Sequence, residues 1–211
     1  CISKRAKTVD IKYRLPSQGP VAHLVIDATG LKVYGEGEWK IRKHGKEKRR
    51  VWRKLHLAVD ATTHAVIAAE VSLETVADNE VLPTLLNPLR RKIKQVSADG
   101  AYDTKACHAL LKKKGAKATI PPRKNAAPWE EDHPRNEAVT ALKAGELKQW
   151  KKDSGYHQRS IAETAMYRFK QLIGPTLSLR NYNAQVGEIL AGVKVMNKLI
   201  GLGMPVRQPV N

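Results

Sequence analysis

The sequence predicts a mixed α/β fold, with one mixed sheet and helices packed on its faces. Two patterns carry this prediction. Strand-like segments come first and include a hairpin-like turn at 61–64, which predicts a three-stranded antiparallel meander. Helices and strands then alternate, which adds two further strands to the sheet and places helices on its faces. The chain shows no internal repeat and no phosphate-binding Gly-rich motif.

The strand predictions rest on apolar runs and on alternation. The first run ends at Asp27, and Gly30 breaks the stretch that follows it. The segment 51–60 alternates between apolar and polar residues, and Pro121-Pro122 ends the last predicted strand. The predicted strands are 22–28, 51–60, 65–72, 94–98 and 116–120.

The helix predictions rest on apolar stripes and on start and stop signals. Asp78 is a candidate N-cap for the first helix, which Pro83 and Pro88 shorten or kink. Gly115 stops the second helix, and Gly145 weakens the third. The predicted helices are 78–90, 104–114, 137–150, 155–173 and 184–200.

The length of 211 residues fits one sizeable core with an insertion. We expect residues 1–20 to be a linker or the remnant of a preceding segment, since they are basic and polar and end in a Pro- and Gly-containing stretch. One domain then spans 21–201, with an insertion at about 121–153 that is irregular in its first half. Residues 202–211 are expected to form a flexible tail. The chain begins with Cys, so it reads as a fragment.

The charge of the chain points to phosphate polyanions. Lys and Arg number 38 against 20 Asp and Glu, a formal net charge of +18 that is spread along the sequence. No basic amphipathic anchor and no long apolar span supports a membrane role. The two cysteines, Cys1 and Cys107, build no disulfide framework and no zinc spacing, and a reducing cytoplasm fits them.

Three carboxylates occupy positions suited to binding a metal ion. Asp27 and Asp99 each end a predicted strand, and Glu163 lies within the predicted helix 155–173. The end of a strand is a rigid platform, and carboxylates are the ligands that Mg2+ prefers. In a very basic chain this pattern indicates metal-dependent chemistry on nucleic acid.

The predicted helix 155–173 carries a row of functional side chains. At 100° per residue, Arg159, Glu163 and Lys170 point to about 300°, 340° and 320° relative to Tyr156. Arg159 and Glu163 are also an i, i+4 pair. Such a row could place a metal ligand at its centre and groups that bind DNA phosphates on both sides of it. The alternative is an exposed face with an ordinary ion pair.

These residues also carry a family resemblance. The spacing Tyr-x2-Arg-x3-Glu-x6-Lys is similar to the signature of DDE transposases in the bacterial insertion-sequence families four and five, the YREK signature. Residues 25–30, Val-Ile-Asp-Ala-Thr-Gly, resemble the first-Asp segment of those enzymes, and residues 99–103, Asp-Gly-Ala-Tyr-Asp, resemble the second. The stretches 30–39 and 54–60 are similar to the family-five branch.

The resemblance implies a ribonuclease H-like DDE catalytic domain and a DNA transposase activity of the cut-and-paste type. It implies that the catalytic residues Asp27, Asp99 and Glu163 bind two Mg2+ ions, with Mn2+ as a substitute. Tyr156, Arg159 and Lys170 would position DNA. The implied partners are transposon-end and target DNA, with a homodimer forming on DNA, and the implied location is the bacterial cytoplasm at the nucleoid.

The segment 40–54 is a basic loop with Trp39 and Trp52 at its flanks. Cations grip a nucleic-acid backbone, and an exposed aromatic ring can stack on an unpaired base. The alternative is a solvated hairpin with Trp52 in the core. The DNA-binding candidates here are Arg42, Lys43, Lys46, Arg49, Arg50 and Arg53.

Other acids compete for the role of ligand. Asp60 leads into a Thr-rich turn and is expected to cap it, while Asp103 is expected to supply the N-terminal charge or cap of the 104–114 helix. Asp99 is preferred to Asp103 because it directly follows a strand.

Two alternative functions remain open on sequence alone. The chain could be a catalytically silent, truncated transposase that binds DNA as an inhibitor. It could also be another ribonuclease H-like nuclease that acts on RNA–DNA hybrids or four-way junctions, although the 156–170 signature argues against this.

Overall fold

The protein is built on a six-stranded mixed sheet with strand order β3-β2-β1-β4-β5 and β6 added beside β1. The structure is a computed structural model, and it describes residue 8, residues 19–33 and residues 51–203. β1, β2 and β3 form the antiparallel meander, while β4, β5 and β6 run parallel to their neighbours. The strands are β1 (Val21–Val33), β2 (Trp52–Asp60), β3 (Val66–Leu73), β4 (Ile93–Ser97), β5 (Lys117–Thr119) and β6 (Thr176–Leu177).

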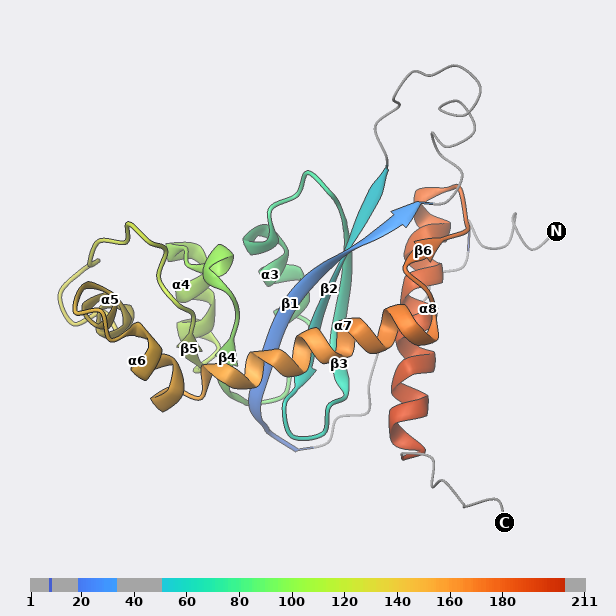
Figure 1. Cartoon of the computed structure of the whole chain (residues 1–211). Coiled ribbons are helices and arrows are strands. Elements are labelled where there is room, and N and C mark those ends of the chain that lie inside the picture. Colours follow the sequence, from blue (N-terminus) through green and yellow to red (C-terminus); the bar gives the residue numbers. More distant parts are fainter. Residues whose placement is uncertain (1–7, 9–18, 34–50, 204–211) are drawn as a thin grey trace, which may run out of the picture.

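Helices cover both faces of the sheet. α3 and α4 pack on one face, and α7 and α8 pack on the other, while α5 and α6 lie beyond β5 (Figure 1). The helices are α3 (Asp78–Leu86), α4 (Lys105–Lys113), α5 (Arg135–Lys143), α6 (Leu147–Asp153), α7 (Ser160–Leu172) and α8 (Tyr182–Gly201), with 3-10 turns η1 (Gly100–Tyr102) and η2 (Tyr156–Arg159). The predicted fold class is therefore confirmed.

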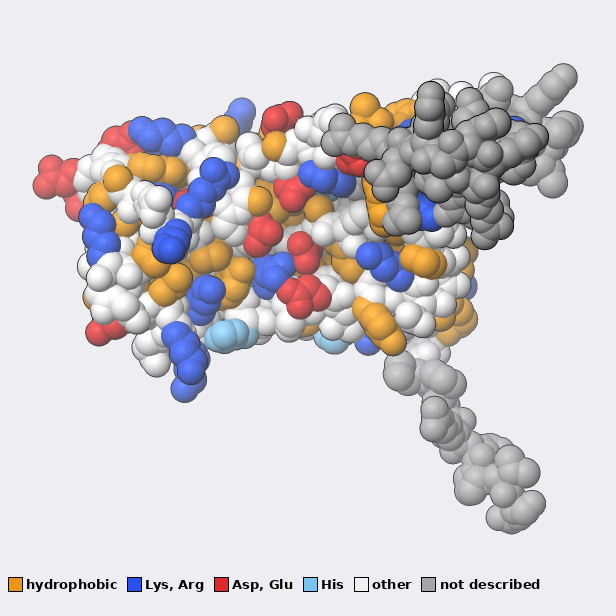
Figure 2. Space-filling view, turned by 45° about the horizontal axis from the view of Figure 1, so that its top comes forward, with side chains coloured by type: hydrophobic (Ala, Val, Ile, Leu, Met, Phe, Trp, Pro, Cys, Tyr) orange, Lys and Arg blue, Asp and Glu red, His pale blue; other side chains and the backbone are white. Residues whose placement is uncertain are grey.

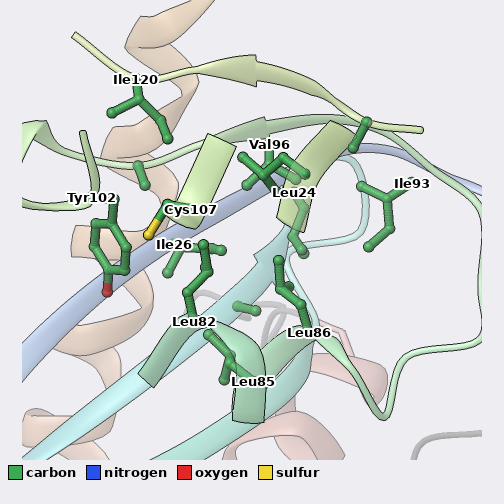
Figure 3. Close-up of a cluster of buried hydrophobic side chains, with 14 of the residues drawn as sticks. Leu24, Ile26, Leu82, Leu85, Leu86, Ile93, Val96, Tyr102, Cys107 and Ile120 are labelled. Atoms are coloured by element: carbon green, nitrogen blue, oxygen red, sulfur yellow. The ribbon is translucent and has the colours of Figure 1, made fainter. Parts of the chain in front are cut away.

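The apolar side chains of β1 are divided between two separate hydrophobic cores, one on each face of the sheet. Leu24 and Ile26 point toward α3 and α4, where they join the cluster drawn in Figure 3. Val25 and Leu31 point the other way, into the cluster made with α7 and α8. Because successive side chains of a strand face opposite sides, one apolar run supplies both cores. Asp27 interrupts that run on the α7 face.

β1 is longer than predicted. It continues through Gly30 to Val33, because its antiparallel ladder with β2 runs from Leu24↔Asp60 to Lys32↔Trp52. β6, which was not predicted, pairs with the last two residues of β1. Asp27 consequently lies in the middle of a strand. The pairing partners override the glycine, which by itself only weakens a strand.

Several helix boundaries also differ from the prediction. The first helix ends at Leu86, and its N-cap is Ala77, since the carboxylate of Asp78 bonds to Lys54 Nζ at 2.9 Å. The single helix predicted at 137–150 is two helices, because Gly145 adopts the left-handed region at φ 76° between them. The predicted helix 155–173 begins as the 3-10 turn η2, which follows Gly155 at φ 70°.

Other predictions fall wholly or partly outside the described residues. These include the linker at 1–20, most of the basic loop and most of the tail at 202–211. Among the described residues, no helix combines the length and apolar character needed to cross a bilayer.

Gly192 allows α7 and α8 to approach closely. A Cβ atom at this position would lie 2.9 Å from Ile173 Cγ2 and 3.0 Å from Phe169 Cε2, whereas one at Gly201 in the same helix would meet nothing within 4 Å. We expect Gly192→Val to lower the free energy of unfolding by about 1–3 kcal/mol through overpacking. Gly201→Val is the control, and it should leave stability unchanged or slightly higher. Chemical denaturation measures both, and equal midpoints for the two variants would contradict this packing.

Candidate active site at β1, β4 and α7

Asp27 lies on β1, and Asp99 lies two residues beyond the end of the neighbouring parallel strand β4. The β1–β4 register pairs Val25 with Ser97, which is the last residue of β4. Two residues further along each chain are Asp27 and Asp99, so both carboxylates extend from the same face of the sheet. β1 continues past this point, whereas β4 ends. Asp99 therefore lies beside Asp27, at the point where β1 loses β4 as its neighbour.

Local backbone contacts orient both aspartates. Asp99 Oδ1 accepts a hydrogen bond from Ala101 N at 2.9 Å, which caps the turn η1. Tyr102, the last residue of that turn, is buried in the core beneath it (Figure 3). Asp27 Oδ1 accepts from Ala28 N at 2.9 Å. One oxygen of each carboxylate is thus held by the main chain, so the two acids have little rotational freedom.

Arg159 joins β1 to α7 at this site. Its Nη1 lies 2.9 Å from Asp27 Oδ2, and its Nη2 bonds to Glu163 Oε1. Glu163 is in the first turn of α7, where the helix dipole favours a carboxylate. The side chain of Asp27 is 18% exposed, whereas that of Glu163 is 55% exposed. The site therefore combines a confined acid with one that has room to move.

Tyr156 completes the cluster from η2. The guanidinium of Arg159 lies 6.0 Å from the centre of its ring, and Lys151 Nζ lies 5.3 Å from it. Burial raises the pKa of Tyr156, while the charge of Arg159 lowers it, and the charges of Asp99 and Asp27 raise it. The phenol is thus close enough to both aspartates to be affected by their charge.

The charges of Asp99 and Glu163 both act on the carboxyl group of Asp27. Burial raises the pKa of Asp27 above its ordinary value; the Ala28 hydrogen bond and Arg159 lower it, and the charges of Asp99 and Glu163 raise it again. Acidic side chains gather in the middle of one face of the molecule, with Lys and Arg among them and to both sides (Figure 2). Several negative groups held together inside a basic surface create a site that favours a cation.

The donor set fits a hard divalent cation in kind, because all three groups are carboxylates. In the arrangement described for residues 19–33 and 51–203, no three His, Cys, Asp or Glu side chains are grouped closely enough to hold a metal ion. The guanidinium of Arg159 instead lies between Asp27 and Glu163 and balances their charge. A metal ion held by Asp27 and Glu163 would compete with Arg159 for the charge of these carboxylates.

The other predicted site residues are placed differently. Lys170 is half-buried, two turns beyond Glu163 on α7. Arg53 donates to Gln185 Oε1 at 2.8 Å and lies 5.4 Å from the ring centre of Tyr182, so it has partners within the protein. Arg42, Lys43, Lys46, Arg49 and Arg50 lie outside the described residues.

Sequence reasoning missed an ionic cluster that ties the insertion to the Asp99 turn. Asp103 is buried and bonds to Arg135 at 2.5 and 2.6 Å, and Arg135 also lies 4.0 Å from the ring centre of Trp129. His108 Nε2 is 3.3 Å from Asp103 Oδ1. Thr104, rather than Asp103, is the N-cap of α4. No local pattern signals this pairing, because Arg135 is distant in sequence and looks like an ordinary insertion charge.

Among the competing acids, Asp60 behaves as expected. Its Oδ1 accepts from Thr62 N at 2.9 Å in the turn after β2, which confirms the predicted turn cap.

The sheet order and the helices on both of its faces are those of a ribonuclease H-like fold, and comparisons with known proteins agree. Residues 20–197 match the family model described as "Transposase DDE domain". The chain belongs to this family. Among solved structures, the piggyBac transposase synaptic complex with hairpin DNA has a TM-score of 0.50 at 14% identity, covering 90% of this chain and 50% of that one. This chain thus spans about half the length of that relative.

Two further solved structures match at lower similarity. One is the catalytic core domain of BIV integrase, with a TM-score of 0.37 at 14% identity, covering 81% of this chain and 82% of that one. The other is a simian T-cell lymphotropic virus intasome in complex with the PP2A regulatory subunit B56 gamma, with a TM-score of 0.39 at 16% identity, covering 84% of this chain and 50% of that one.

Asp27→Asn should make the protein more stable at neutral pH. Because the folded-state pKa of Asp27 is raised, the folded state binds more protons than the unfolded state between the two pKa values, and stability falls as pH rises through that window. The Asn variant lacks this penalty, so its melting temperature should exceed that of the wild type at pH 7. The difference should vanish at a pH where Asp27 is protonated; a lower melting temperature at pH 7 would contradict the prediction.

Asp103→Asn should have the opposite effect. Burial raises the pKa of Asp103, but the bonds from Arg135 and His108 outweigh burial and bring it from 3.8 to about 2. Its stabilisation is therefore present above 3.8 and lost as pH falls through about 2. We expect a loss of at least about 2 kcal/mol near neutral pH, at roughly 1.4 kcal/mol per pKa unit. Denaturant titration measures this loss, and an unchanged midpoint would refute it.

Proposed function

We propose that this chain is the catalytic domain of a DNA transposase of insertion-sequence families four and five, acting by cut-and-paste transposition. In this proposal it hydrolyses a phosphodiester at a transposon end and joins the freed 3′ hydroxyl to target DNA. One observation carries the proposal. Asp27, Asp99 and Glu163 come from three segments far apart in sequence, yet Arg159 pairs with both Asp27 and Glu163, and the β1–β4 register brings Asp99 next to Asp27.

The chemistry follows from the character of the three acids. Asp27, Asp99 and Glu163 would hold two Mg2+ ions, or Mn2+ in their place, and such ions activate the attacking water or hydroxyl and stabilise the leaving oxygen. The two aspartates supply ligands whose orientation is already set by the main chain. Glu163 supplies an exposed ligand that can adjust when DNA arrives.

Arg159 has two roles in this proposal. It balances the charge of Asp27 and Glu163 before DNA binds. Its forked guanidinium is also suited to phosphate, and on release from the carboxylates it would grip the DNA backbone beside the cut. Tyr156 and Lys170 would position the same strand from either side along η2 and α7.

The net charge of +18 supports DNA as the partner, because it favours salt-dependent binding to phosphates. Arg42, Lys43, Lys46, Arg49, Arg50 and Arg53 are the proposed contacts away from the cut. The related piggyBac structure is a synaptic complex with hairpin DNA. By extension, we propose that two copies of this protein pair transposon ends as a homodimer on DNA, in the bacterial cytoplasm at the nucleoid.

The test compares active-site variants with a matched acid. Asp27→Asn, Asp99→Asn and Glu163→Gln should each lower Mg2+-dependent nicking of end-containing DNA by about 100- to 1,000-fold, since metal stabilisation is worth several kcal/mol. Asp60→Asn changes a carboxylate that caps a turn, and it should nick as the wild type does. Gel-shift affinity for DNA should change little in all four. Full nicking by the three active-site variants would rule out this assignment.

A DNA-binding chain that does not cut is the second candidate. The Arg159 contacts favour it, because they hold two of the three carboxylates in an ion-paired arrangement. Wild-type protein that shifts DNA on a gel but nicks with neither Mg2+ nor Mn2+ would establish this candidate instead.

A further inference from the structure

A strip of polar side chains crosses the sheet on the α7 face, next to the carboxylates. The register places His23 beside Gln95 and Ser97 beside Thr119. His23 Nε2 is 2.7 Å from Ser97 Oγ, and Gln95 Nε2 donates to Thr119 Oγ1 at 2.8 Å. His23, Ser97 and Thr119 are buried. Polar groups in such positions are costly unless they are bonded, so their partners need to be accounted for.

The strip continues out of the sheet into the segment that leads to α7. Gln95 Nε2 also donates to the carbonyl oxygen of Ser154, at 2.8 Å. β1 is also in contact with η2, where the side chain of Gln158 interacts with His23. Two sheet residues therefore contact the stretch 154–158, one near each end of it. This stretch is otherwise short of apolar anchors, since α6 and η2 contain no fully buried residue.

His23, on β1, contacts the end of β4 and the turn η2 that precedes α7. It lies four residues before Asp27 on the same face of β1, and its partner Ser97 lies two residues before Asp99. Its other partner, Gln158, directly precedes Arg159. A shift of His23 relative to either partner would therefore move the acids relative to one another.

We propose that His23 and Gln95 are positioning residues, which dock the stretch 154–159 on β1 and β4 and thereby set Arg159 and Glu163 against Asp27 and Asp99. Neither residue touches the reacting atoms. The proposal rests on the proposed function for its effect on cleavage, but its effect on structure can be measured separately.

His56 offers a matched control within the same sheet. It is also a buried histidine, and its Nε2 is 2.9 Å from Ser72 Oγ. It pairs with Ala28, whose side chain faces away from that of Asp27, and its contacts do not include η2. His23→Leu and His56→Leu thus remove the same kind of bond, but only the first removes a contact to the segment before α7.

The experiment compares His23→Leu, Gln95→Leu and His56→Leu by hydrogen exchange, Mn2+ calorimetry and nicking. All three variants should melt at lower temperature than the wild type. Only His23→Leu and Gln95→Leu should raise amide exchange in residues 154–163, by about tenfold or more. They should also weaken Mn2+ binding and lower nicking by up to about 100-fold, the effect expected of an ångström-scale displacement. His23→Gln, which keeps a donor and an acceptor, should restore much of both.

Two results would overturn the proposal. One is wild-type exchange in residues 154–163 of folded His23→Leu and Gln95→Leu. The other is an equal loss of nicking and Mn2+ affinity in His56→Leu, which would reduce the effect to general destabilisation. If the wild type itself does not nick, the proposed function fails, while the exchange measurement still decides whether these residues dock the segment.

Discussion

The structure depends on the pairing of β1 with different neighbours on its two sides. β2 runs antiparallel to β1 almost along its whole length, while β4 runs parallel to it and ends at Ser97. The side chains on each face of β1 pack into a hydrophobic core. A shift of the β1 pairing register by one residue would therefore exchange the side chains that face the two cores. The register is therefore strongly specified. That same register places Asp27 beside Asp99 at the point where β4 ends, and it leaves space there for α7.

Two aspartates show how the same side chain can serve opposite purposes. Asp103 is buried with Arg135 and has a pKa well below its ordinary value, so its charge stabilises the fold. Asp27 has a raised pKa despite its contact with Arg159, because burial and two neighbouring acids oppose its charge. A carboxylate whose surroundings disfavour its charge is typical of a functional site, since a bound cation can relieve it. Asp103, with its stable ion pair, and Asp99, next to Asp27, lie at the two ends of the same short turn after β4.

Polar contacts attach two segments close to that turn, in addition to the apolar packing of η1, α4 and α7. Arg135 ties the insertion to Asp103, and Gln95 and His23 contact the stretch that leads into α7. Hydrogen bonds have narrow geometric limits, whereas apolar contacts tolerate small shifts. A polar attachment is therefore well suited to a segment whose exact placement decides where Arg159 and Glu163 lie. The two hydrophobic cores hold the sheet and pack α7 against it. In our proposal, the polar strip sets the exact position of the stretch that leads into α7.

Alternation is a local pattern, and it predicted the class of fold and the antiparallel meander, both of which the structure confirms. The motifs around Asp27, Asp99 and Glu163 are also local patterns, and they predicted the three acids of the proposed site. Local patterns could not show that β1 runs on through Gly30, since its partners β2 and β6 lie elsewhere in the chain. They also gave no sign that Tyr156 and Arg159 lie on a 3-10 turn, or that Arg135 pairs with Asp103. These features depend on groups that folding brings together from distant segments of the chain, so the tertiary structure was needed to find them. The same holds for the contact of Arg159 with both Asp27 and Glu163.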